Sequence, residues 1–368
     1  MNLNLGRKLA ATGAGRGNLT NTNINPGAYD GFNEFSYSGL IQKYDYNFLV
    51  DYFKNIGIYT YHTDDGWVYP LSNSAKNISE YLMAFVRSLN IKLINESRVI
   101  SITQELNNFY LKLENDSSLK FDKLIIATGG KAYPQLKASD SILKILLKLG
   151  HKIIPAYPAL APLETTKYQS DLLNGVRLNA KISLTKNGSI IKSEFGNIIF
   201  TEWGINGPGV MNISHQIHKL TGNSELIVDF GYQEIRELII SNLQNVNLYN
   251  LETGMILNPF FSKKIIDQIL KNSGINSTIN LGHLSQEFKT KLIDNMSISE
   301  KVKGTRGFSY SQLSTGAVNS IDVDPLSLES KIISGIYFAG EILDAIGPCG
   351  GYNLHWAFIS GINAGRSV

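Results

Sequence analysis

The chain has 368 residues, of which 43% are hydrophobic and 18% charged, and its formal net charge is +3. This length allows a large core and predicts two domains. The small charge, with no basic run interleaved with aromatic residues, argues against nucleic-acid binding. The one cysteine, Cys349, excludes an intrachain disulfide framework and a thiolate metal cluster, and favours a cytoplasmic protein. No apolar run is long enough to span a bilayer, so we expect no membrane association.

The first glycine cluster, Gly13-Ala-Gly-Arg-Gly17, is not expected to be a dinucleotide-binding turn. Such a turn needs a strand before it and a helix directly after it. Here the residues from Asn18 to Pro26 are rich in Asn and Thr, which favour turns over helix interiors. We predict a polar loop. It either lines a cofactor through side chains such as Arg16, Asn18 and Asn21, or forms a surface turn that satisfies its own hydrogen bonds.

Hydrophobic spacing predicts the elements that follow. Residues 79–89 read as a helix with one apolar face and 91–94 as a strand, which together make half of a βαβ unit. A small antiparallel meander comes next. Residues 123–127 then read as a second buried strand that ends in Thr128-Gly129-Gly130. The strands of the meander are expected at 99–103, 109–113 and 119–121.

A domain boundary is predicted at Pro155, where prolines crowd together. Residues 155–305 then form an insert, first β-rich and then helical, while 1–154 and 306–368 form one discontinuous domain. The strands of the insert are expected at 180–185 and 197–201, and its helices at 233–243, 259–271 and 284–296.

No metal site is expected. His215 and His218 lie three residues apart on a predicted helix, but no Cys and no carboxylate in the next turn joins them. We interpret them as a surface pair.

The C-terminal segment carries the strongest functional signal. Ile336 to Ala339 reads as a strand between two glycines, which puts Glu341 at the carboxyl end of the strand. Open α/β sheets bind ligands at that end. A carboxylate there can accept hydrogen bonds from the hydroxyls of a sugar-like chain, such as the ribityl chain of FAD.

A glycine pair and a helix follow. Gly350-Gly351 lets backbone come close to a ligand, and the free N–H groups at the helix start suit a phosphate or the negative charge on a reduced flavin. The alternative is a packed strand and helix without a ligand. The apolar spacing predicts that the buried face consists of Leu354, Ala357, Phe358, Gly361 and Ile362.

Four residues near this segment have simpler interpretations. We interpret Cys349 as a packing residue, because no resolving thiol accompanies it. His355 is expected to be a satisfied helix residue. Tyr352 and Trp356 either stack on the cofactor or fill the core, and both alternatives stay open.

The motifs together resemble a known family, the BaiN/YhiN-like flavoproteins, also labelled aminoacetone-oxidase-type FAD-binding enzymes. The resemblance covers essentially the whole chain and keeps the order of the motifs. It implies an α/β fold: a glutathione-reductase-type, Rossmann-like FAD-binding domain with a β-rich segment and a helical insert. The motifs are Gly6-Arg-Lys-Leu9 with Thr12 to Asn21, Ala127 to Pro134, Gly304 to Phe308, and the terminal segment.

The resemblance also implies roles for individual residues. Gly340 and Glu341 would hold the ribityl chain, the glycine pair and the helix start would face the pyrophosphate and the flavin edge, and the turn after the second strand would let backbone approach FAD. Arg306 would face the substrate, with a structural salt bridge as its alternative. The remaining positions are Thr128, Gly129 and Gly130 in the turn, Gly350, Gly351, Tyr352 and Asn353 at the helix start, Val99 at the adenine, and Arg7, Lys8, Arg16 and Asn18 along the cofactor.

The sequence departs from the family pattern in three places. The family usually has Cys at Gly17 and a glycine-rich stretch at Gln135 to Ser141. It also begins with a strand, a Gly-x-Gly-x-x-Gly turn, a helix and a second strand, which we expect to be missing before Met1 and to leave FAD affinity reduced. A start codon assigned too late is favoured over a split or decaying gene, or another segment that completes the sheet.

The predicted function is that of a cytoplasmic FAD-dependent oxidoreductase with a small-molecule substrate. A reduced nicotinamide, NAD(P)H, is implied as electron donor by family analogy alone. The alternative is a non-catalytic remnant that keeps the fold but binds FAD weakly or not at all. Neither the substrate nor the oligomeric state follows from the sequence.

Overall fold

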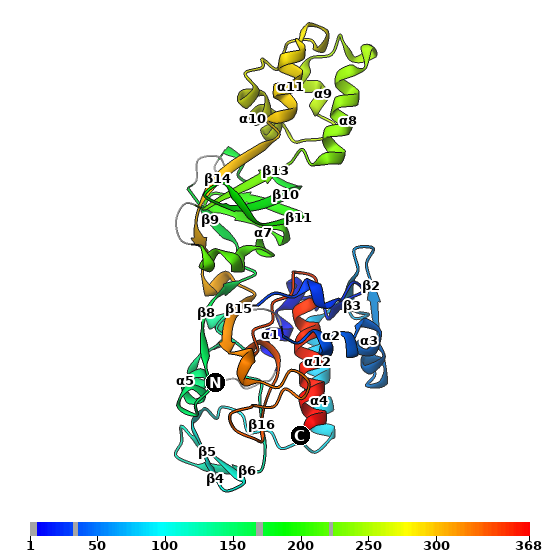
Figure 1. Cartoon of the computed structure of the whole chain (residues 1–368). Helices are drawn as coiled ribbons and strands as arrows, with labels where there is room; N and C mark the ends of the chain where they lie inside the picture. Colours follow the sequence, from blue (N-terminus) through cyan, green and yellow to red (C-terminus); the bar gives the residue numbers. More distant parts are fainter. Residues whose placement is uncertain (1–5, 32–35, 167–171, 221–223) are drawn as a thin grey trace. The chain divides into compact units, whose positions relative to one another are not determined.

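The computed structural model describes residues 6–31, 36–166, 172–220 and 224–368, and the chain divides into two compact units. Unit 1 comprises Met1–Leu160 and Gly307–Val368, and unit 2 comprises Ala161–Arg306 (Figure 1). The first division falls after the predicted boundary, because strand β8 (Ile153–Ala159) pairs antiparallel with β15 (Leu313–Val318) inside unit 1. The roles predicted for the two parts stay predictions.

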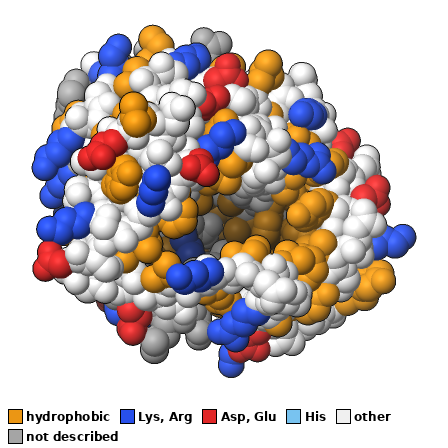
Figure 2. Space-filling view, turned by 90° about the horizontal axis from the view of Figure 1, so that it is seen from below, with side chains coloured by type: hydrophobic (Ala, Val, Ile, Leu, Met, Phe, Trp, Pro, Cys, Tyr) orange, Lys and Arg blue, Asp and Glu red, His pale blue; other side chains and the backbone are white. Residues whose placement is uncertain are grey.

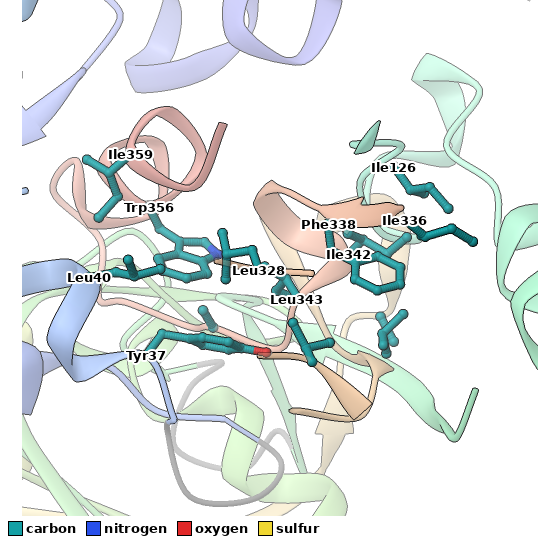
Figure 3. Close-up of a cluster of buried hydrophobic side chains, with 14 of the residues drawn as sticks. Tyr37, Leu40, Ile126, Leu328, Ile336, Phe338, Ile342, Leu343, Trp356 and Ile359 are labelled. Atoms are coloured by element: carbon teal, nitrogen blue, oxygen red, sulfur yellow. The ribbon is translucent and has the colours of Figure 1, made fainter. Parts of the chain in front are cut away.

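The centre of unit 1 is a parallel pair of strands from distant parts of the chain. Strand β7 (Leu124–Ile126) pairs with β16 (Ile336–Phe338), so the C-terminal strand joins a strand from the first part of the domain. Figure 3 shows Ile126, Ile336 and Phe338 in one buried cluster with side chains from α12 and the N-terminal half. β16 is buried along its whole length, whereas β7 buries Leu124 and Ile126 and leaves Ile125 44% exposed, so the prediction of a fully buried strand is confirmed only for β16.

The predicted meander is confirmed, whereas the prediction of a strand at residues 91–94, just before it, is wrong. β4 (Val99–Glu105), β5 (Asn108–Leu113) and β6 (Ser118–Phe121) pair antiparallel in that order. Residues 91–94 form no strand, and the Ile91 side chain is 52% exposed. An extended segment needs a neighbour for its backbone groups, and among the described strands none pairs with 91–94.

A small sheet of order β1-β3-β2 holds the segment after the first glycine cluster. β1 (Thr20–Asn21) pairs antiparallel with β3 (Trp67–Pro70), which pairs with β2 (Thr60–His62). Asn18, Thr20 and Asn21 are therefore buried, and the surface-turn interpretation is wrong. The glycine cluster itself lies in a turn between α1 (Arg7–Ala10) and β1, in which Gly13 and Ala14 have left-handed backbone angles, without the strand and helix of a dinucleotide-binding turn.

The helices of unit 1 cover these small sheets. Helix α4 (Ala75–Ser88) starts earlier than predicted, because Ser74 caps it by accepting a hydrogen bond from the Asn77 N–H. The C-terminal helix α12 (Tyr352–Ser367) buries His355, Trp356, Ile359, Ser360 and Asn363. The apolar face predicted for it is only half-buried, so that prediction is wrong. The other helices are α2 (Ser38–Lys43), α3 (Tyr46–Asn55) and α5 (Ser141–Lys148).

Unit 2 contains a closed barrel and a group of helices. The described strands of the barrel follow the order β10-β11-β12-β9-β14-β13. Inward side chains such as Ile182, Phe200 and Val228 are fully buried, as expected for a barrel filled by alternate residues. The strands are β9 (Leu163–Thr165), β10 (Arg177–Lys186), β11 (Ser189–Thr201), β12 (Gly204–Asn206), β13 (Ser224–Asp229) and β14 (Ser297–Thr305).

The helical part of unit 2 lies beyond the barrel strands (Figure 1). Helix α10 buries Ile265, Ile266 and Ile269 against its neighbours, which gives this part its own apolar core. The helices of this part are α8 (Gln233–Gln244), α9 (Thr253–Leu257), α10 (Lys263–Ser273) and α11 (Gln286–Asp294), whereas the short helix α7 (Pro208–Met211) packs against the barrel strands β10 and β11.

The interpretation of the histidines as a surface pair is wrong. His215 is only 2% exposed, and its Nε2 lies 2.8 Å from Gln216 Nε2. His218 is half-buried, and burial lowers its pKa to about 4. Within the described ranges, no helix combines the length and the apolar character needed to cross a membrane.

Candidate functional site

Glu341 is held by hydrogen bonds from two other segments of unit 1. It follows β16 in the turn Gly340–Ile342, and its side chain is 11% exposed. The backbone N–H and the hydroxyl of Ser314 both donate to Glu341 Oε1, at 2.9 and 3.1 Å. Lys8 forms an ion pair with Glu341 Oε2. The carboxylate thus joins β15, β16 and α1.

The turn predicted to approach a cofactor lies directly beside this carboxylate. A Cβ atom placed on Gly130 would lie 2.6 Å from Glu341 Oε1 and 2.1 Å from Ser314 Oγ, so a side chain there would collide with both. A Cβ on Gly129 would lie 3.9 Å from Glu341 Oε2. The structure therefore brings the turn of Thr128, Gly129 and Gly130 together with Glu341 and Lys8.

The glycine pair before α12 is required by the protein's own backbone. Gly351 has φ 98°, and a Cβ on it would lie 2.2 Å from the Thr20 carbonyl oxygen. Gly350 accepts a hydrogen bond at 2.9 Å from the Asn21 side chain. Strand β1 therefore packs against the start of α12. The backbone N–H groups in the first turn of an α-helix have no hydrogen-bond partner within the helix.

Asn353 holds the loop that precedes α12. Its Nδ2 donates to the Gly347 carbonyl and its Oδ1 accepts from the Gly347 N–H, both at 2.8 Å. The side chain is thereby engaged within the protein, and only the backbone N–H of Asn353 is left to face a ligand. Cys349, in the same loop, is half-buried and forms no disulfide.

Asn18 contributes a buried amide to the same place. It is 6% exposed, and in the described structure neither its Oδ1 nor its Nδ2 has a hydrogen-bond partner. A Cβ on Gly351 would lie 2.7 Å from Asn18 Oδ1, so the amide adjoins the start of α12. A buried amide without a partner is unfavourable, which makes Asn18 a candidate for contact with a ligand.

Arg16 is held by the small sheet. Its Nε donates to Asn73 Oδ1 at 2.9 Å, its NH2 group donates to the Tyr61 hydroxyl at 3.1 Å, and its guanidinium lies 3.9 Å from the centre of the Tyr69 ring. The hydrogen bond to Tyr61 raises the pKa of Arg16. Arg16 therefore presents a positive charge in a defined orientation.

Trp356 and Ser360 link Glu341 to α12 through Gly340. The Gly340 carbonyl accepts from Trp356 Nε1 at 3.1 Å, and the Gly340 N–H donates to Ser360 Oγ at 2.9 Å. Trp356 is 1% exposed and packs on Tyr37, as Figure 3 shows. It fills the core, which decides between the two alternatives for this residue.

His355 is a satisfied helix residue, as expected. Its Nε2 donates to the Tyr44 carbonyl at 2.9 Å, and its Nδ1 accepts from the Thr20 hydroxyl at 2.8 Å. In the neutral ring these two contacts place the proton on Nε2. Burial lowers the pKa of His355 to about 4.

Three further predicted residues lie in α1, in β4 and in unit 2. Arg7 precedes Lys8 in α1, and Val99 begins β4 in the meander. Arg306 belongs to unit 2, where its guanidinium lies 4.1 Å from the centre of the Trp203 ring. Arg306 thus stacks on an aromatic ring, a contact that the sequence did not indicate.

Comparison with known proteins identifies the family. The chain matches the HI0933-like protein Rossmann domain family over residues 1–367. It belongs to this family. The BaiN/YhiN-type members are FAD-dependent oxidoreductases, so the expected resemblance is confirmed, together with a Rossmann-type FAD-binding fold of α/β content.

Relatives with named activities cover nearly the whole chain. The 3-dehydro-bile acid delta(4,6)-reductase of Clostridium scindens is 29% identical, with 99% of this chain and 90% of the relative covered. The ribosomal RNA dihydrouridine synthase of Escherichia coli is 28% identical over 96% of this chain and 87% of its own length. The Haemophilus influenzae synthase is 27% identical, with 99% and 90% covered.

Among solved structures, Aquifex aeolicus GidA aligns with 99% of this chain at 11% identity and a TM-score of 0.35. The chain spans 61% of the length of that protein.

Proposed function

We propose that this protein is an FAD-dependent reductase that adds hydrogen across a carbon–carbon double bond conjugated with a carbonyl group. The names of its relatives support this reaction class. A 3-dehydro-bile acid delta(4,6)-reductase acts on double bonds conjugated with a ketone. Dihydrouridine differs from uridine by hydrogen added across the double bond next to a ring carbonyl. One reaction type thus accounts for relatives with different substrates.

The observation that carries the proposal is the arrangement around Glu341. An ionised carboxylate accepts about four hydrogen bonds. Ser314 and Lys8 supply three of them, which leaves one acceptor position, on Oε2 and beside Gly129. Gly340 connects this position to α12, whose first turn supplies N–H donors and the positive end of the helix dipole.

These features fit FAD. Glu341 would accept a hydrogen bond from the ribityl chain, and the first turn of α12 would face the pyrophosphate or the flavin edge. The turn at Thr128 would let backbone lie against the cofactor. The unpartnered amide of Asn18 and the charges of Arg7, Lys8 and Arg16 would lie along the cofactor, and Val99 would lie at the adenine.

The flavin would supply the hydride, and the protein would bind and orient both reactants. The positive end of α12 would stabilise negative charge on the cofactor. We propose NAD(P)H as the electron donor and Arg306, stacked on Trp203, as a contact for the substrate.

We favour a small-molecule substrate over RNA. The net charge is only +3, and Figure 2 shows Lys and Arg side chains interspersed with Asp and Glu on the face in view. Binding to RNA rests on a contiguous basic surface that neutralises phosphates. An enone of modest size fits this charge distribution better.

One observation favours the alternative of a protein that keeps the fold but binds FAD weakly or not at all. Lys8 already neutralises Glu341 within the protein. The ion pair reduces the free energy gained from a further hydrogen bond to Glu341, because Lys8 already compensates the negative charge of the carboxylate.

Visible absorption of the purified chain tests the proposal. We expect a flavin spectrum after addition of FAD, bleaching by NADH or NADPH without oxygen, and recovery of the colour on addition of cyclohexenone or a conjugated 3-oxosteroid. A protein that stays colourless with FAD in excess would establish the alternative. A flavin spectrum that no enone restores after bleaching would reject the reaction class but not the cofactor.

A further inference from the structure

We infer that Ser314 is a positioning residue, which orients Glu341 so that its last acceptor position receives a hydroxyl of the flavin's ribityl chain. The inference rests on the proposed function and adds a residue that the sequence did not single out. Ser314 lies in β15 and is 6% exposed. Nothing in its local sequence signals a role, since its contacts come from residues distant in the chain.

The directions of the hydrogen bonds at Ser314 are fixed by chemistry. Its hydroxyl accepts from the Lys131 N–H at 2.9 Å, since a backbone N–H can only donate. The hydroxyl proton therefore goes to Glu341 Oε1, which can only accept. With the Ser314 N–H also on Oε1, both lone pairs of that oxygen are used. Ser314 thus fixes the orientation of the Glu341 carboxylate and leaves Oε2 available to other donors.

The backbone beside Ser314 is strained, which shows that its position is determined by the surrounding structure. The pairing of β15 with β8 shifts register between Thr315 and Ala317, and Ala317 has φ 89°, a conformation that side chains rarely adopt. The buried Asp344 carboxylate anchors this bulge by accepting from the Gly316 N–H at 2.9 Å. Strained conformations persist only where several contacts hold them, and they gather at functional sites.

The remaining position on Glu341 selects a class of ligand. Its oxygen carries negative charge, so it repels a phosphate and accepts from a hydroxyl. Lys8 takes one side of Oε2, which leaves room for one donor. A hydroxylated chain therefore satisfies the position, whereas a flavin without such a chain has no hydroxyl to donate there. Riboflavin and FAD carry the ribityl chain, whereas lumiflavin has a methyl group in its place.

Binding of three flavins to the full chain tests the inference, measured by quenching of flavin fluorescence. We expect Ser314→Ala to weaken FAD and riboflavin binding about 10-fold, because a hydrogen-bond network to a charged group is disturbed, and to leave lumiflavin binding unchanged. Ser314→Thr keeps the hydroxyl and should restore binding. Ser311→Ala is the matched control, because Ser311 is also buried but donates to the Phe308 carbonyl.

The outcomes separate the inference from the proposed function. If the wild-type chain binds none of the three flavins, the proposed function fails and the inference with it. If it binds FAD but Ser314→Ala weakens riboflavin and lumiflavin equally, Ser314 is only structural and the inference alone is overturned. Should Ser314→Ala fail to fold, Ser314→Cys, with its weaker S–H donor, must show the same loss of preference for riboflavin over lumiflavin.

Discussion

Different kinds of contact hold each unit together internally. In unit 1, polar contacts join residues far apart in the chain, such as Lys8 with Glu341 and Thr20 with His355, separated by 333 and 335 positions. The barrel of unit 2 is held by backbone pairing of strands, both in the hairpin of β10 and β11 and between distant strands such as β9 and β14. The residues proposed to hold the cofactor therefore also hold unit 1 together, and substitutions there should affect both stability and binding.

The largest effect is expected at Gly351. In Gly351→Ala the new Cβ would meet the Thr20 carbonyl oxygen at 2.2 Å in a left-handed conformation, whereas Gly274 in unit 2, also left-handed, has open space around it. We expect the free energy of unfolding to fall by about 3 kcal/mol or more in Gly351→Ala, and by about 1 kcal/mol in Gly274→Ala. Urea unfolding measures both. Equal losses would show that contact with β1 does not determine this turn.

The stability of unit 1 should depend on pH through His355. Its folded pKa of about 4 lies below the ordinary value of 6.5, so the unfolded chain binds more protons between these values. The stabilisation is complete above pH 6.5 and is lost as pH falls toward 4, by about 3 kcal/mol. Unfolding of His355→Gln should show a flatter profile.

A matched control uses the exposed His62, and His62→Gln should keep the wild-type pH profile. His218 in unit 2 has its pKa lowered to about 4 by burial as well, so His355→Gln removes only part of the dependence. Burial also lowers the pKa of His151 in unit 1, so a variant profile identical to that of the wild type would show that His355 does not contribute to the pH dependence.

A smaller effect is expected at Asp229 in unit 2. Both oxygens of Asp229 accept hydrogen bonds from Arg236, each at 2.9 Å, and the two side chains are partly buried. Asp229→Asn should lower the free energy of unfolding by about 1 kcal/mol and leave flavin binding unchanged. Asp267→Asn, which breaks an exposed pair with Lys263, should have less effect. Weakened flavin binding in Asp229→Asn would contradict the assignment of the site to unit 1.

Helix α12 shows why an apolar pattern predicted an element but not its buried face. The pattern counts hydrophobic residues, yet the helix also buries His355, Ser360 and Asn363. Their hydrogen bonds are met by the carbonyls of Tyr44, Trp356 and Leu326, respectively, which removes the penalty for burial. Those carbonyls come partly from distant segments, and a local pattern contains no information about them.

Short-range patterns were sufficient for the strands at β7 and β16, the meander, the placement of Glu341 after a strand and the helix behind it, because local spacing and turn residues control these features. The family could be recognised from the order of its motifs. Tertiary structure alone decided that Ser314 and Lys8 meet Glu341, that Asn18 to Asn21 and His215 are buried, and that residues 91–94 form no strand. Each of these depends on whether a partner from another part of the chain is present, and hydrogen bonds and burial are properties of pairs rather than of single segments.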